Sequence, residues 1–243
     1  MLGSPTITAE ERAIRVTIFG SSTPQSLPVY TAASEAFGRG LARAGLDGVF
    51  GGGNAGCMGA FYDGMLAEHG RVHGITHRMF VKPGGSSLSE ENAGSLESLE
   101  IVEGRDLTLR KRRLLDAGDC LVTLPGGVGT FDELFMAIAE RGVGCGDLPV
   151  LVLNTDGYYD GAIAQLHAAA DAGMLRHKVD EYVDVVSTPE DAVAWCLQRQ
   201  RRTLPSKMAP EDAAAYFRGV VHGIAAAAVA TAIVAALVRV WKP

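Results

Sequence analysis

The chain lacks the cysteine spacing on which disulfide scaffolds and zinc sites depend. Four of its 243 residues are cysteine, at positions 57, 120, 145 and 196, and no two of them form a CxxC pair. Residues 1–15 carry acidic side chains and no apolar stretch, unlike a secretory signal. We therefore expect reduced thiols, a cytoplasmic location, and neither a disulfide framework nor a metal site.

The chain also lacks an excess of positive charge. It has 22 lysines and arginines against 28 aspartates and glutamates, which gives a net charge of −6. This balance argues against a nucleic-acid partner, although it leaves room for local anion sites. With 47% apolar residues, the chain has ample material for a buried core, so disorder over its whole length is excluded.

Short apolar, β-branched runs alternate along the chain with amphipathic stretches. This alternation is typical of parallel strands covered by helices on both faces. It predicts the α/β class, as a Rossmann-like, doubly wound parallel sheet in three αβα layers. The predicted strands are 14–19, 48–50, 71–76, 99–102, 120–124, 150–153 and 183–186, and the predicted helices are 28–44, 56–69, 108–117, 130–141, 161–172 and 189–201.

The predicted organisation has three parts. The folded domain spans 1–202, a linker and amphipathic approach spans 203–218, and a hydrophobic tail helix spans 219–243. Residues 219–238 carry no formal charge and would reach about 30 Å as a helix, the thickness of a bilayer core. We expect either a membrane anchor, with the domain facing the cytosol, or a soluble helix packed on the protein. The long loop at 77–98 is expected to be a flap over the active site.

Two glycine clusters each follow a predicted strand and precede a predicted helix. The first covers residues 51–59 (GGGNAGCMG) and the second residues 125–130 (PGGVGT). At such a junction the unpaired N–H groups of the helix start attract anions, and glycine lets the backbone approach a ligand. Neither cluster has the Gly-Lys-Ser/Thr of a P-loop or the acidic ribose partner of a dinucleotide site. The clusters predict phosphate sites, with glycine-rich packing turns as the alternative.

Four consecutive basic residues, Arg110-Lys111-Arg112-Arg113, lie on the helix that precedes the second cluster. Such a run is ordinarily a solvated helix face. Its position before the glycine cluster favours Arg110 and Lys111 as substrate contacts, with the other two arginines as structural residues. Glu133 lies one helical turn after the cluster, so its carboxylate can point back to the same loop. The alternative is a first-turn carboxylate that stabilises the helix dipole, which is the role we expect for Asp132.

The glycine clusters belong to a longer series of sequence blocks. The blocks are FGSS at 19–22, GGGNAGCMG at 51–59, DLTLRK at 106–111, PGGVGTFDE at 125–133 and NTDGYY at 154–159. In this order, over about residues 14–200, the chain resembles the LONELY GUY proteins. These are cytokinin riboside 5′-monophosphate phosphoribohydrolases that were once taken for lysine decarboxylases. Lysine decarboxylation is not expected here, because no lysine is placed like a pyridoxal-phosphate Schiff-base residue.

The resemblance implies hydrolysis of the N-glycosidic bond of an adenosine-type 5′-monophosphate, which releases the free base and ribose 5-phosphate. It assigns the catalytic pair to Arg110 and Glu133, with Lys111 as a binding residue. The carboxylate would stabilise the oxocarbenium-like ribose and orient water, and the arginine would hold phosphate or the departing purine. The resemblance further implies a homodimer and no metal or other cofactor. The other substrate-binding residues that it implies are Ser22, Gly52, Gly53, Met58, Gly59, Glu91, Gly126, Gly127, Gly129 and Thr130.

The chain departs from the family pattern in two places. Thr108 stands where the family commonly has histidine, and Ala139-Glu140 stands where Thr-Trp is expected. The second departure leaves the shape of the base pocket open. The alternatives to a cytokinin-releasing enzyme are therefore a broader nucleosidase for AMP and other purine 5′-monophosphates, and a non-catalytic nucleotide-binding module. The presence of both Arg110 and Glu133 disfavours the module.

Overall fold

The computed structural model describes residues 13–81, 88 and 94–199, which belong to one compact unit that ends at Arg201. The predicted linker and tail helix, 203–243, and the predicted ligand Glu91 lie outside the described residues. Within the described part, no helix is both long enough and apolar enough to cross a membrane.

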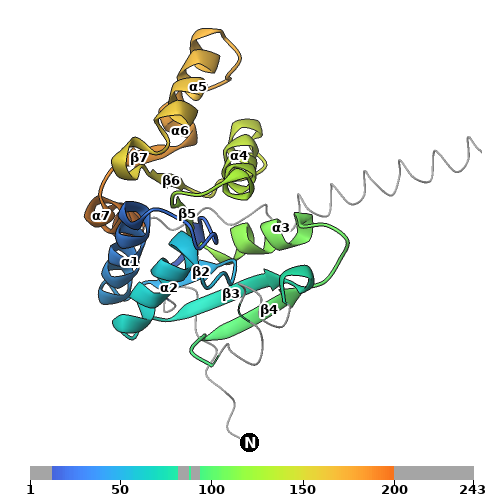
Figure 1. The fold of residues 1–243 in the computed structure, drawn as a ribbon. Helices are drawn as coiled ribbons and strands as arrows, with labels where there is room; N and C mark the ends of the chain where they lie inside the picture. Colours follow the sequence, from blue (N-terminus) through green and yellow to red (C-terminus); the bar gives the residue numbers. More distant parts are fainter. Residues whose placement is uncertain (1–12, 82–87, 89–93, 200–243) are drawn as a thin grey trace, which may run out of the picture. The chain divides into compact units, whose positions relative to one another are not determined.

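Seven strands form one parallel sheet in the order β4-β3-β2-β1-β5-β6-β7 (Figure 1). Strand β1 pairs with both β2 and β5, so that Val16 is in register with Gly48 on one side and Cys120 on the other. Because both faces of the sheet are covered, β2, β3, β5 and β6 are buried along their whole length. The strands are β1 (Arg15–Phe19), β2 (Asp47–Phe50), β3 (Val72–His77), β4 (Ser98–Val102), β5 (Cys120–Thr123), β6 (Val150–Leu153) and β7 (Asp184–Val186).

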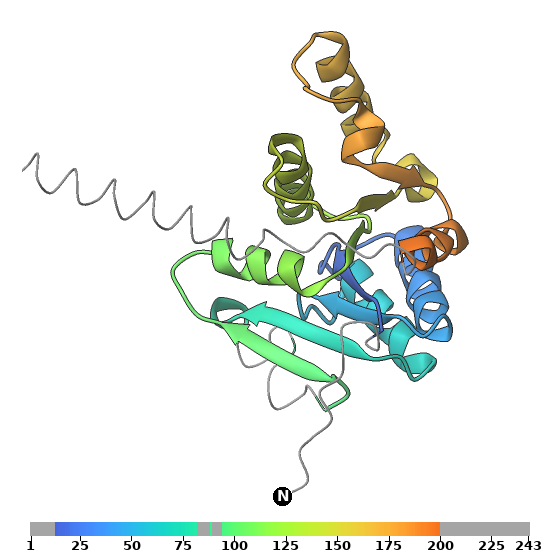
Figure 2. The same cartoon turned by 180° about the vertical axis from the view of Figure 1, so that it is seen from behind.

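Helices cover the two faces of the sheet, so that it forms the middle of three layers (Figures 1 and 2). Helices α1, α2 and α7 share one apolar core with Val16 and Ile18, whereas α3 to α6 share the other with Phe19 and Ile75. The predicted αβα layering is therefore confirmed. The helices are α1 (Pro28–Arg43), α2 (Gly56–Ala67), α3 (Thr108–Ala117), α4 (Val128–Val143), α5 (Asp160–Asp171), α6 (Val179–Tyr182) and α7 (Pro189–Arg199).

Some local elements differ from the prediction. Helix α4 begins at Val128, two residues before the predicted start, because Gly127 is its extended N-cap residue. Strand β3 includes His77, and a 3₁₀ turn, η1 (Arg78–Phe80), follows it where we expected loop. A second 3₁₀ turn, η2 (Thr155–Gly157), and the one-turn helix α6 were not predicted, since neither is long enough to show a periodicity.

The chain changes direction across the sheet at β1. It passes from β1 outward through β2, β3 and β4, and then returns to the other side of β1 as β5. In sheets of this kind, ligands bind at the carboxyl ends of the strands beside such a switch point. The loops after β1 and β5 meet there, where the Ser21 N–H donates to the Pro125 carbonyl at 3.0 Å. Both glycine clusters follow strands at this edge.

Candidate active site

A buried arginine lies where α3 crosses the ends of β2 and β3. Arg110 is 6% exposed, and its Nε donates to the Ile75 carbonyl oxygen at 3.2 Å. Its Nη2 donates to the Gly51 carbonyl oxygen at 3.2 Å, and its Nη1 donates to Glu133 Oε1 at 3.1 Å. These bonds, all to described residues, use three of the five N–H groups of a guanidinium. The solvated-helix-face alternative is thus wrong for Arg110.

Glu133 reaches the same point from α4. Its side chain is 14% exposed and forms an ion pair with Arg110. Burial raises the pKa of Glu133, while the charge and hydrogen bond of Arg110 act in the opposite direction. Burial also lowers the pKa of Arg110, but a guanidinium remains charged in proteins. The pair therefore brings a carboxylate and a fixed cation together in a poorly hydrated position.

Gly51 makes room for this arrangement. A Cβ at position 51 would overlap Nη2 of Arg110, so a side chain there would push the guanidinium away from the Gly51 carbonyl oxygen. The first glycine cluster therefore begins with a residue that positions Arg110. The family resemblance implied Gly52 and Gly53 from this cluster as ligands but not Gly51, because the role of Gly51 depends on a helix that follows much later in the chain.

The rest of the basic run forms ion pairs along the same helix layer. Lys111 Nζ is 2.8 Å from Asp132 Oδ2, and its side chain is 17% exposed. Arg112 bonds to Glu140 with both terminal nitrogens, at 2.9 and 2.5 Å. Arg113 pairs with Glu100 at 3.5 Å, so Arg112 and Arg113 both contact carboxylates of the protein, and their role as structural residues stays a prediction.

The helix-dipole interpretation of the two carboxylates is wrong. Helix α4 has no acidic residue in its first turn, because it begins at Val128. Asp132 and Glu133 lie in the second turn, beyond the unpaired N–H groups that carry most of the dipole effect. Asp132 pairs with Lys111 and Glu133 with Arg110, so both carboxylates bridge α4 to α3.

Most of the first glycine cluster is packed against the protein. Gly52 has a φ of +78°, which favours glycine, and its carbonyl accepts the Leu88 N–H at 2.7 Å. A Cβ on Gly53 would crowd Met58 and Ser22, so these three predicted ligands lie together. Gly59 is needed for packing, since a Cβ there would be 2.6 Å from the Asn54 backbone.

The second glycine cluster divides into a packed part and an open part. Gly126 is buried, and a Cβ there would overlap the side chain of Thr130, which is 4% exposed. Gly127 and Gly129 are exposed, and a Cβ on either residue would have no neighbour within 4 Å. The first N–H groups of α4 have no intrahelical acceptor, so this open backbone can receive an anion.

Two tyrosines that sequence reasoning did not assign hold the second cluster. Tyr158 Oη donates to the Gly126 carbonyl at 2.6 Å, and Tyr159 Oη donates to the Leu124 carbonyl at 2.7 Å. The Asn154 side chain accepts the Tyr159 N–H at 2.7 Å. The NTDGYY block at 154–159 therefore contains residues that hold the loop in place through hydrogen bonds. The spacing of the block does not show which atoms these residues contact.

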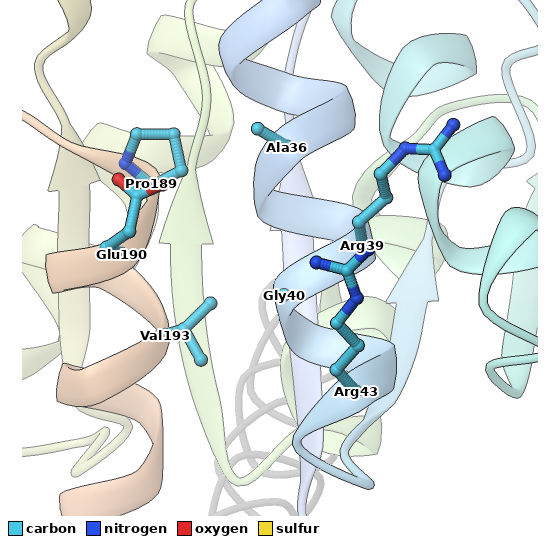
Figure 3. Close-up of a pocket in the computed structure, with 7 residues that line it drawn as sticks. All are labelled: Ala36, Arg39, Gly40, Arg43, Pro189, Glu190 and Val193. Carbon is cyan, nitrogen blue, oxygen red and sulfur yellow. The ribbon is translucent and has the colours of Figure 1, made fainter.

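A surface hollow lies on the other face of the sheet, between α1 and α7 (Figure 3). Its volume is about 360 Å³. The two arginines at its rim, Arg39 and Arg43, both pair with Glu68, at 3.3 and 2.7 Å. It is separated by the sheet from the Arg110–Glu133 pair. The lining residues are Ala36, Arg39, Gly40, Arg43, Pro189, Glu190 and Val193.

Comparison with known proteins shows which family the chain belongs to. A family model described as "Possible lysine decarboxylase" matches residues 58–196. The cytokinin riboside 5′-monophosphate phosphoribohydrolase of Rhodococcoides fascians is 30% identical over 191 residues, which make up 78% of this chain and 93% of that protein. This chain belongs to the LONELY GUY family of phosphoribohydrolases. A protein of the same name from Mycobacterium marinum is 33% identical over 161 residues, 66% of this chain and 82% of the relative.

Solved structures support the fold of this family member. A molybdenum cofactor binding protein from Rippkaea orientalis superposes with a TM-score of 0.56 at 19% identity, over 77% of this chain and 97% of the other. The molybdenum cofactor carrier protein of Chlamydomonas reinhardtii also gives a TM-score of 0.56, at 18% identity, over 79% and 100% of the two chains. At these identities the likeness shows the Rossmann-like architecture and carries no argument about ligands.

Proposed function

We propose that this enzyme hydrolyses the N-glycosidic bond of cytokinin riboside 5′-monophosphates and releases the free base and ribose 5-phosphate. The observation that carries the proposal is the buried ion pair between Arg110 and Glu133, 3.1 Å apart at the edge of the sheet beside the switch point. The activity named for the relatives from Rhodococcoides fascians and Mycobacterium marinum supports it.

Glu133 supplies the negative charge that this reaction requires. As the C–N bond breaks, positive charge develops on the ribose, and a nearby carboxylate stabilises it. The same carboxylate orients a water molecule toward C1′ and accepts its proton. The oxygen of that water bonds to C1′, while the base leaves with the bonding electron pair and takes up a proton from solvent, to which Glu133 later returns the proton that it accepted.

Arg110 supplies a fixed positive charge beside this carboxylate. Its contacts to the carbonyl oxygens of Ile75 and Gly51 hold the guanidinium in place. The remaining N–H groups can bind the phosphate or the electron-rich departing purine, and Lys111 adds a second cation nearby. No step in this scheme uses a metal or another cofactor.

The open backbone of the second glycine cluster is the proposed phosphate site. Gly127 and Gly129 lie at the start of α4, where a 5′-phosphate can accept from the unpaired N–H groups. Glu133 is on the same helix, so a nucleotide whose phosphate binds there places its ribose toward the carboxylate. The other predicted contacts, at Ser22, Gly52, Gly53 and Met58, border the neighbouring loop.

The test is incubation of the purified chain with AMP and, separately, with isopentenyladenosine monophosphate, followed by chromatography of the free base. We expect release of isopentenyladenine at a higher kcat/KM than that of adenine. Equal or better use of AMP would instead show the broader purine nucleosidase. Release of neither base would contradict the proposal and would favour a non-catalytic nucleotide-binding module.

We also propose that two copies of the chain associate through the outer side of α4, in the cytoplasm. Val128, Phe135 and Val143 are 83%, 39% and 65% exposed on that helix. Their spacing of seven and eight residues places them on one side of it, and a two-fold interface uses the same patch on both copies.

Light scattering of the purified chain at micromolar concentration is expected to give the mass of a dimer. Phe135→Glu should give a monomer, because it places a charge in the centre of the apolar patch. Met174→Glu is the control, since Met174 is 77% exposed after the end of α5. A monomeric unmodified chain, or equal behaviour of the two variants, would contradict this interface.

A further inference from the structure

An aromatic ring lies against the arginine of the proposed catalytic pair. The Cζ atom of Arg110 is 5.5 Å from the centroid of the Phe80 ring, within the range of a cation–π contact. Arg110 is 6% exposed, whereas Phe80 is 41% exposed. The ring therefore separates part of the guanidinium surface from solvent.

The turn that carries this ring is held at two points. The Met79 N–H donates to Nδ1 of His77 at 3.2 Å, so a side chain of β3 caps η1. The His77 ring, 2% exposed, lies 6.4 Å from the Phe80 ring at an angle of 72°. Arg78 Nε donates to Glu103 Oε1 at 2.8 Å, which ties the turn to the segment after β4. Phe80 is thus fixed in relation to β3, the strand whose Ile75 carbonyl also binds Arg110.

We propose that Phe80 is a positioning residue for this reaction, which acts by covering Arg110 and keeping its guanidinium directed at Glu133. The inference rests on the proposed function, since it assigns Phe80 a part in the work of the Arg110–Glu133 pair. The face of an aromatic ring attracts a cation, and the attraction grows as water is removed. The ring also keeps water molecules from competing for the N–H groups of the guanidinium, so that these groups stay hydrogen-bonded to the carboxylate and the substrate.

The first test compares variants at position 80 with a control at the neighbouring residue. Phe80→Leu keeps an apolar cover but removes the π face, and we expect it to lower kcat/KM by about twofold to thirtyfold. Phe80→Trp and Phe80→Tyr should keep most of the activity. Met79→Leu is the matched control, because Met79 is 46% exposed on the same turn. Equal kcat/KM for Phe80→Leu and Met79→Leu would overturn the inference.

The second test asks whether Phe80 acts through Arg110. In an Arg110→Ala background, Phe80→Leu should cause no further loss, because the partner of the ring is already gone. A full additional loss would show that the ring contacts the substrate directly and would overturn the positioning role.

The pH profile of kcat/KM is a third test, because a purely structural role of Phe80 would leave this profile unchanged. Burial is the main cause that raises the pKa of Glu133, and Arg110, Asp132 and Lys111 are the charged groups that also act on it. Phe80→Ala lets water reach the pair, which lowers the pKa of Glu133, whereas a loosened Arg110 would raise it. Because burial is the largest cause, kcat/KM should be lost on acidification at a lower pH than in the unmodified chain, and an unchanged profile would count against the cover. If the unmodified chain releases no base at all, the proposed function fails; if it is active and the Phe80 variants match the control, the inference alone fails.

Discussion

Glu133→Gln is expected to lower the rate of base release by about 100- to 1,000-fold, with the fold unchanged. Glutamine keeps the size of the side chain and one acceptor oxygen for Arg110 but removes the negative charge, so it can neither stabilise an oxocarbenium-like ribose nor accept the proton of water. Arg110→Ala should cause a loss of similar size, because it removes the fixed positive charge beside the reacting centre. The measurement is single-turnover release of the base from the nucleotide.

A control with a buried carboxylate is available at the opposite end of β2. Asp47, the first residue of that strand, pairs with Arg71, and its side chain is 9% exposed, against 14% for Glu133. Asp47→Asn and Arg71→Ala remove a buried charge and its partner at a position away from the pair. These variants should stay near the unmodified rate, and thermal unfolding should show whether any variant has lost its fold. Near-normal turnover of the nucleotide by Glu133→Gln or Arg110→Ala would contradict the proposed mechanism.

The dependence of activity on pH follows from the environment of Glu133. The reaction requires the ionised carboxylate, and burial raises its pKa above the ordinary value of 4.5. Activity should therefore be lost on acidification at a higher pH than for an exposed glutamate. On the acid side of the pH profile, activity rises with pH because the ionised carboxylate is the active form. In Glu133→Gln this loss of activity at acid pH should be absent, whereas in Asp47→Asn it should occur at the same pH as in the unmodified chain.

The sequence was sufficient to predict the layers, the strands and the two residues of the pair. Alternation of apolar runs and helical stretches follows directly from a sheet buried on both faces. The positions before and after the second glycine cluster indicated Arg110, Lys111 and Glu133 as candidates, and the family resemblance then assigned Arg110 and Glu133 as the pair. The start of α4 was misplaced, because Thr130 is a residue type favoured at helix N-caps, while the chain instead uses Gly127.

The sequence could not predict what holds the pair. Two of the partners of Arg110 are backbone carbonyls, of Ile75 and Gly51, and a carbonyl has no signature in the side-chain pattern. Phe80 lies in a stretch that was expected to be loop, so nothing marked it as a neighbour of Arg110. The glycines gave an incomplete prediction for a similar reason: Gly59 and Gly129 look alike in sequence, but only the structure shows which is enclosed by backbone and which is open.

A nucleoside without its 5′-phosphate is expected to be a poor substrate, with kcat/KM at least about 100-fold below that of the nucleotide. Charge-assisted hydrogen bonds contribute about 1.5–3 kcal/mol each, so two of them at the start of α4 account for this factor. The comparison uses isopentenyladenosine and its monophosphate with the same preparation of enzyme. Equal turnover of the two compounds would contradict the phosphate site.

Gly129→Ala tests where that phosphate binds. A Cβ at position 129 meets no atom within 4 Å, so the added methyl group fits the fold and obstructs only a ligand that approaches the backbone. Gly161, near the start of α5, has equally open surroundings and lies outside the proposed site, so Gly161→Ala is the matched control. Alanine favours a helix over glycine by about 1 kcal/mol, so neither variant should lose stability.

We expect Gly129→Ala to raise the KM for the monophosphate and to leave the weak use of the nucleoside unchanged, because the nucleoside has no phosphate for the methyl group to displace. If both alanine variants keep the original KM, the phosphate binds elsewhere than at the start of α4.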